Sequence, residues 1–174
     1  KTQVQVAYGK LPLYFIQNGG QVDERVKFYE KGSGHATYFT KEGVYLSLAK
    51  SQESEATGKK TEDGSQKSDL PSVIASIAKQ SRSEFIKLIF LGANKDPKIL
   101  PEELREGKVN YFIGNDPKSW KTNIPTYRAI VYKEIYPGID IKFYGNNHQL
   151  EYDIIVKPGA DPSKVTLAYE GIEG

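Results

Sequence analysis

Three carboxylates on two predicted strands are the best candidates for catalytic residues, judged by residue type and spacing. Asp140 lies before a predicted turn at residues 145–147, and Glu151 and Asp153 lie after it. Paired carboxylates can hydrolyse glycosidic bonds, one as the acid and the other as the base or nucleophile. The outer face of any half-buried hairpin also carries polar residues, however. We therefore interpret all three as surface residues and expect a protein without catalytic residues, not an enzyme.

The sequence offers little that could hold a metal ion. His35 and His148 lie beside turns and have no HxH or HExxH partner, whereas a zinc site needs three or four ligands with local pairs. Asn115, Asp116 and Asp161 could donate oxygens to calcium, but the spaced acids of an EF-hand are absent. Asx-Pro turns explain these residues equally well. We expect solvated loop histidines, no metal site and no cofactor, with bound calcium as the alternative.

Five aromatic residues near predicted loops and strand ends form the candidate ligand-binding set. A row of such rings on one face would stack against sugars, as aromatic rings stack against bases. Tyrosine also fills half-buried strand positions, where the ring packs and the hydroxyl reaches water. Both interpretations stay open for Trp120, Tyr127, Tyr132, Tyr136 and Tyr144.

The first eight residues suggest a different kind of contact. In the segment Lys1–Tyr8, Val4 and Val6 alternate with glutamines and Tyr8 follows. An arm of this kind can add as a strand to the sheet of another subunit, and open sheet edges invite such pairing. The alternative is that the arm pairs with its own sheet.

The hairpin predicted over residues 139–156 is the main structural element. Ile139, Ile141 and Phe143 alternate with polar residues before the Gly-Asn-Asn turn, and apolar residues again alternate after it. A period of two with one apolar side is typical of a half-buried strand. Glycine and asparagine tolerate the positive φ that a tight turn needs.

Other short apolar segments between turns also predict strands, and the whole pattern predicts an antiparallel β-sandwich of nine or ten short strands. We expect Phe85–Leu91 at the centre, because both of its faces are apolar, and Pro97–Glu106 as a loop with one helical turn at Pro101–Leu104. The remaining predicted strands are Leu11–Ile16, Val26–Glu30, Ala36–Phe39, Val44–Leu48, Val109–Ile113, Tyr127–Tyr132 and Val165–Tyr169.

One segment differs in composition from the rest. Residues 49–69 carry charges of both signs and almost no large apolar side chain, which predicts a mobile insertion within a single domain of residues 1–174. Leu70–Gln80 is the one predicted helix, because Val73, Ile74 and Ile77 share a face.

The composition predicts a globular chain. The 174 residues are 38% hydrophobic and 26% charged, and the net charge of +2 without a dense basic cluster argues against nucleic-acid binding. No apolar run approaches the roughly 20 residues of a membrane helix. The absence of cysteine excludes disulfides and thiolate sites. Methionine is absent even at position 1, and we therefore expect a processed fragment, with a removed signal peptide as one explanation.

Three segments carry a family resemblance, namely residues 11–44, 107–165 and 167–171. They resemble the N-terminal domain of large secreted or surface proteins, bacterial and archaeal, with SBBP-type β-propeller repeats. The resemblance implies an exported, cell-surface setting and tandem modules, and it brings no catalytic residues. In that family the domain continues past the last matching strand, and the polar stretch is shorter.

Together these observations predict a non-catalytic structural or adhesive module of an exported surface protein. Its expected partners are neighbouring domains or other copies, joined through sheet edges. The alternatives are an extracellular filament subunit that polymerises by strand donation and a carbohydrate-binding module.

Overall fold

A single curled antiparallel sheet makes up most of the protein. The computed structural model describes residues 13–32, 34–49, 83–146 and 149–171. The predicted helix Leu70–Gln80 and the polar insertion of residues 49–69, apart from residue 49, lie outside this part. Within the described part, the only helical elements are two three-residue 3-10 turns, η1 (Pro117–Ser119) and η2 (Pro162–Lys164).

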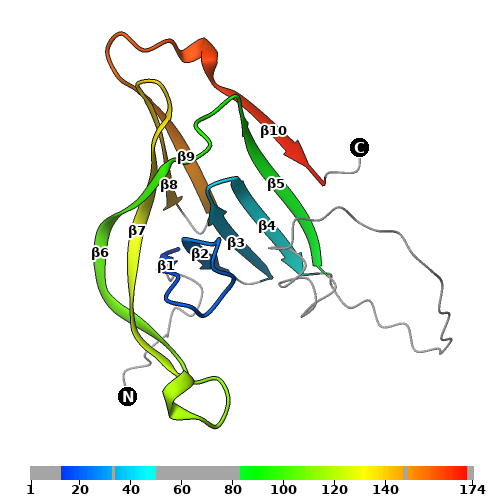
Figure 1. The fold of residues 1–174 in the computed structure, drawn as a ribbon, viewed down its shortest axis with the longest axis vertical. Helices are drawn as coiled ribbons and strands as arrows, with labels where there is room; N and C mark the ends of the chain where they lie inside the picture. Colours follow the sequence, from blue (N-terminus) through cyan, green and yellow to red (C-terminus); the bar gives the residue numbers. More distant parts are fainter. Residues whose placement is uncertain (1–12, 33, 50–82, 147–148, 172–174) are drawn as a thin grey trace, which may run out of the picture.

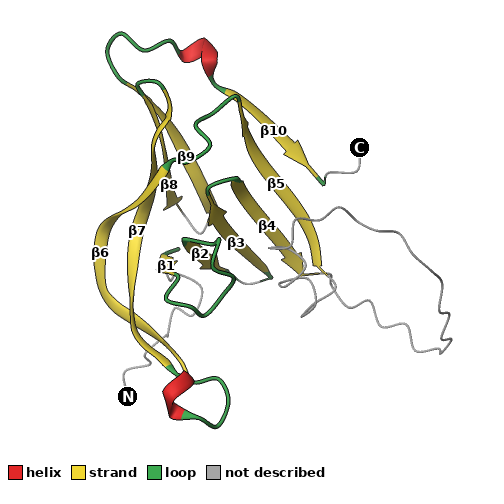
Figure 2. Ribbon diagram, viewed as in Figure 1, coloured by secondary structure: helices red, strands yellow, loops and turns green. Residues whose placement is uncertain are grey.

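Ten strands are described, and they confirm the all-β antiparallel prediction (Figures 1 and 2). The two layers of the expected sandwich are the two halves of one continuous sheet. Its order is β10-β5-β4-β3-β2-β1-β7-β8-β9, with β6 paired to the other side of β7. The strands are β1 (Phe15–Gln17), β2 (Phe28–Lys31), β3 (His35–Thr40), β4 (Gly43–Ala49), β5 (Ser83–Leu91), β6 (Lys98–Tyr111), β7 (Lys121–Tyr136), β8 (Ile139–Asn146), β9 (Gln149–Val156) and β10 (Thr166–Glu170).

The main core lies inside the curl, where the two halves of the sheet face each other. Phe15, Phe39 and Phe143 come from β1, β3 and β8, and their rings meet edge to face with centroids 5.4 and 5.2 Å apart. Burying such large rings supplies much of the apolar area that drives folding. A second cluster lies on the outer face, where Tyr29, Tyr38 and Tyr45 are cross-strand neighbours.

The segment predicted as a loop, Pro97–Glu106, is largely strand, and the predicted helical turn at Pro101–Leu104 is wrong. Residues 98–111 form the long strand β6, in which Pro101 lies opposite Ile130 of β7. In the described part β6 pairs with β7 alone, so it is an edge strand. An edge strand tolerates proline because one of its sides needs no N–H donor.

The predicted hairpin of residues 139–156 is confirmed as β8 and β9, with Ile141 opposite Ile154 and Phe143 opposite Tyr152. Strand β5 has a partner on each side, β4 and β10, so Phe85–Leu91 is an interior strand as predicted, but it lies next to the end of the sheet and not at its centre.

Candidate functional site

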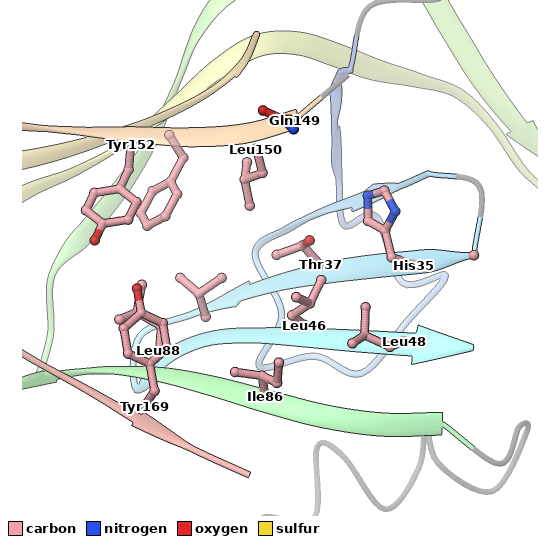
Figure 3. Close-up of a pocket in the computed structure, with 13 residues that line it drawn as sticks. His35, Thr37, Leu46, Leu48, Ile86, Leu88, Gln149, Leu150, Tyr152 and Tyr169 are labelled. Carbon is pink, nitrogen blue, oxygen red and sulfur yellow. The ribbon is translucent and has the colours of Figure 1, made fainter. Parts of the chain in front are cut away.

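An apolar groove of about 510 Å³ lies between the two halves of the curled sheet (Figure 3). Leu46, Leu48 and Ile86 of β4 and β5 line one wall, and Leu150 and Tyr152 of β9 line the other. The register explains this wall, because Leu46 lies directly opposite Ile86 and both side chains therefore share a face. Volumes of this size are typical of binding sites.

A buried acid lies behind one end of the groove. The Glu30 carboxylate accepts a hydrogen bond of 3.2 Å from the Thr37 hydroxyl and lies 3.3 Å from Nε2 of His35. Burial raises the pKa of Glu30, and the contacts with His35 and Thr37 only partly oppose this effect. His35 is therefore not the solvated loop residue we predicted. The sequence analysis missed Glu30, although an acid inside the predicted strand Val26–Glu30 was a usable signal.

The absence of a side chain at Gly32 leaves the space that the His35 ring occupies beside Glu30. A Cβ at residue 32 would lie 2.0 Å from the nearest ring atom of His35, and the ring could not keep its position. The polar end of the groove therefore depends on a glycine two residues after the acid that the histidine contacts.

Strand β9 borders the groove and has one free edge. In the described part β9 pairs with β8 alone and β10 with β5 alone. The Lys157 amide donates to the Gly138 carbonyl at 2.9 Å, and the hydrogen-bonded positions of β9 alternate from there. The backbone groups of Tyr152, Ile154 and Val156 consequently point away from β8, towards an unoccupied strand position.

The apolar residues of this edge are partly open to solvent. Tyr152 is 37% exposed, Ile154 is 41% and Val156 is 40%, and across the groove Tyr169 of β10 is 52% exposed. The hydroxyl group of Tyr152 lies close enough to Tyr169 to raise the pKa of Tyr169. The two edges thus touch at one point through side chains, without a backbone ladder between them.

The five predicted ligand-binding aromatics do not form one surface. Tyr132 and Tyr136 are buried in the main core, where the Tyr132 hydroxyl donates to the Thr40 carbonyl at 2.8 Å. Tyr127 packs edge to face against Phe28, and Tyr144 donates to Asp153 at 3.1 Å. Trp120 lies at the end of η1, in the loop between β6 and β7. For the buried tyrosines, packing in strand positions is therefore the correct interpretation.

The loop between β6 and β7 carries an apolar tip, of which the sequence analysis singled out Trp120 but missed Phe112 and Ile113. Phe112 and Trp120 meet edge to face with centroids 5.2 Å apart, and Ile113 lies beside Phe112 in the chain. The Trp120 indole N–H donates to the Gly114 carbonyl at 3.1 Å. On its other side Trp120 borders an open hollow, with Gln17, Thr122 and Asn123. The signal in the sequence was a pair of large apolar residues beside a polar turn.

The three carboxylates differ in environment. Asp140 is buried, which corrects its assignment to the surface, and it accepts hydrogen bonds from the Glu134 amide at 2.8 Å and from Lys133 at 3.1 Å. Asp153 accepts from Tyr144, and Glu151 accepts from Asn146 at 3.0 Å. Each carboxylate is thus engaged with a neighbour on β7 or β8.

The calcium candidates act as caps of 3-10 turns. Asp116 accepts from the Lys118 amide and Asp161 accepts from the Ser163 amide, each at 3.0 Å, and Asn115 is in the turn before η1. No group of three or more histidine or acidic side chains that could hold a metal ion occurs among the described residues. His148 lies outside them.

The candidate strand-donor arm, with Val4, Val6 and Tyr8, also lies outside the described residues. The described part begins at Leu13, whose side chain lies against Gly145, because a Cβ there would be 2.6 Å from the Leu13 Cβ. Gly145 is opposite Leu150, a groove residue. Leu13, the first described residue, therefore lies near the β8–β9 turn, at one end of the groove.

Comparisons with known proteins gave one match. No curated protein and no solved structure matched the chain. In the part of the chain that the structure describes, no helix is long and apolar enough to span a membrane. The model of one protein family matches residues 15–174, most of the chain. The chain therefore belongs to the family described as "Domain of unknown function (DUF7948)".

Proposed function

We propose that this domain is a non-catalytic structural and adhesive module of an exported cell-surface protein, and that it binds its partner by β-strand addition along β9. One observation carries the proposal: β9 presents outward backbone groups and apolar side chains beside an apolar groove. The resemblance to the N-terminal domain of SBBP-repeat proteins supports the surface setting.

A strand added to β9 would continue the inner face of the sheet. The side chains of Tyr152, Ile154 and Val156 lie on the same face as Phe143 and Ile141, which are fully buried. An added strand would place every second side chain over the groove and would supply the missing backbone partners. It would bury the exposed apolar edge, which otherwise invites uncontrolled pairing.

The segment we propose as the added strand is Lys1–Tyr8 of a second copy. Val4 and Val6 alternate with Gln3 and Gln5, so two small β-branched side chains would face the groove together. The eight residues of the arm match the eight residues of β9 in length. Addition in trans would join copies into a filament, and its extent would depend on concentration.

The test compares the assembly of four chains by light scattering and negative-stain imaging over a range of concentrations. They are the full chain, the chain without Lys1–Tyr8, Ile154→Pro and Ile154→Ala. Proline removes an outward N–H that β8 does not use, whereas alanine only shortens the side chain. We expect assemblies from the full chain and from Ile154→Ala, and monomers from the other two.

Monomers of the full chain at every concentration would contradict the proposal. Assemblies of Ile154→Pro as extensive as those of Ile154→Ala would show that the backbone edge of β9 is not the joint. A circular dichroism spectrum unchanged from the full chain would show that Ile154→Pro keeps its fold.

A further inference from the structure

The tip of the β6–β7 hairpin gathers three large apolar side chains at one end of the molecule. Phe112 is 62% exposed, Ile113 is 66% and Trp120 is 38%. In Figure 1 the hairpin extends beyond the rest of the sheet, and its loop forms the lower end of the described chain. Contiguous exposed apolar residues on a projecting loop mark an interaction surface.

Local contacts hold the tip in one arrangement. The Trp120 ring is fixed by its hydrogen bond to Gly114 and by the edge-to-face contact with Phe112. The turn beneath it is capped by Asp116, and the Ser119 hydroxyl donates to the Asp116 carbonyl at 2.7 Å. The apolar side chains are therefore presented outward by an ordered turn, at little further entropic cost on binding.

The geometry of the rings argues against a flat ligand. The planes of Phe112 and Trp120 cross at 84°, so together they offer no continuous platform for a sugar ring. The indole N–H, which could bond a sugar hydroxyl, is already bonded to Gly114. A projecting wedge of this shape fits a soft apolar layer better than a rigid planar ligand.

The charges of the loop favour an anionic surface. Lys118 and Lys121 lie on either side of Trp120 in the chain, and the one acid between Phe112 and Asn123, Asp116, caps the turn. Tryptophan is enriched at the boundary of lipid headgroups and acyl chains, and lysines near an anionic bilayer are attracted to its headgroups. We propose that this tip inserts into the headgroup boundary of an anionic lipid bilayer and holds the domain at the membrane surface.

Three apolar side chains and two lysines give reversible binding, weaker than that of a spanning helix. Removing one large apolar side chain is expected to lower the vesicle partition coefficient about tenfold. Neutralising both lysines is expected to abolish the preference for anionic over zwitterionic vesicles, and raising the salt concentration is expected to weaken that preference.

Trp120 is the only tryptophan of the chain, so its fluorescence reports on the tip alone. The experiment uses the full chain with vesicles of phosphatidylcholine, or of phosphatidylcholine mixed with phosphatidylglycerol, and measures vesicle flotation, the emission shift and quenching by brominated lipid. We expect flotation, a blue shift and quenching with the anionic vesicles. We expect the double variant Phe112→Ser with Ile113→Ser, which keeps the reporter, to lose all three.

Leu104→Ser is the matched control, because Leu104 of β6 is 68% exposed and lies outside the tip. It should float and shift like the native chain. A native chain that neither floats nor shifts with anionic vesicles would overturn the proposal. So would equal losses in Leu104→Ser and in the double tip variant, or binding that Lys118→Gln with Lys121→Gln leaves unchanged.

Discussion

The carboxylate of Asp140 stabilises the place where the pairing of β7 and β8 is irregular. The pairing of β7 with β8 shifts register between Tyr132 and Tyr136, and within the shift Glu134 has a φ of 51°. The Asp140 carboxylate accepts from the Glu134 amide and lies 3.5 Å from the Lys157 ammonium. Burial alone would raise the pKa of Asp140, but this amide, Lys133 and Lys157 together hold it below the usual value.

We predict that Asp140→Asn lowers the free energy of unfolding by about 2 kcal/mol at neutral pH, because two partly buried hydrogen bonds lose the negative charge of their acceptor. The effect should shrink in acid. A lowered folded-state pKa stabilises the native state above the unfolded pKa of about 3.9, and this contribution is lost as the pH falls through the folded-state pKa. Urea unfolding of both proteins across this pH range measures the difference.

Asp153→Asn is the control for this prediction, because Asp153 is exposed on the same hairpin and accepts one hydrogen bond from Tyr144. Its substitution should change stability by less than about 1 kcal/mol. A similar loss in both variants, or an Asp140→Asn effect that persists unchanged in acid, would contradict the role given to Asp140.

At the scale of the elements, the β3–β4 turn is fixed by close backbone packing. Gly43 has a φ of 148°, and a Cβ there would lie 2.4 Å from the Leu88 carbonyl oxygen of β5. We predict that Gly43→Ala lowers the free energy of unfolding by about 2 kcal/mol or more, because the carbonyl must move out of the β4–β5 pairing. Denaturant unfolding measures the loss.

Gly92→Ala is the control that separates the cost of backbone strain from the cost of the close contact with Leu88. Gly92 also has a positive φ, 69°, but no atom lies within 4 Å of the position of its Cβ. This variant should lose only the strain cost, about 1 kcal/mol. An equal loss at both glycines would show that the approach to Leu88 is not what position 43 requires.

Elements that depend on a local sequence pattern were predicted correctly. The predictions were wrong where the structure of a segment depends on which strand it pairs with. The β8–β9 hairpin follows from alternation and a Gly-Asn turn. The predicted strand Val109–Ile113 covers only the last three residues of β6. The rest of β6 was missed because Pro101 and the polar residues around it are typical of a loop, and only its edge position beside β7 permits a strand. The buried state of Asp140 depends on the bulge in β7, which the alternation of β8 does not show.

The groove could not be predicted from the sequence because it also depends on which strands are neighbours in the sheet. The alternating apolar residues of β9 predict one buried face, yet Ile154 and Val156 are partly exposed because no described strand lies beyond them. Sheet order determines whether a face is covered, and this order brings β3, β4, β5 and β10 opposite β9. The chain carries no local signal for that juxtaposition.

At the scale of the whole molecule, the free edge of β9 should be visible in amide exchange. In the monomer we predict fast exchange at Tyr152, Ile154 and Val156, whose amides point outward, and slow exchange at Asp153 and Ile155, which face β8. Residue-resolved NMR of the chain without Lys1–Tyr8 measures the alternation. Uniform protection along β9 in that monomer would show that the edge is already paired.

One edge of strand β7 pairs with two strands, the distant strand β1 from the start of the chain and the adjacent strand β8. Tyr127 lies opposite Phe15 of β1, and Ile130 lies opposite Phe143 of β8. A second pairing of segments far apart in the sequence joins β5 to β10. Such long-range pairings close large loops of unfolded chain, and closing a loop costs conformational entropy. This cost arises before the new contacts can offset it. We therefore expect the local hairpins to assemble early and the docking of β1 and β10 to limit the rate at which the domain folds.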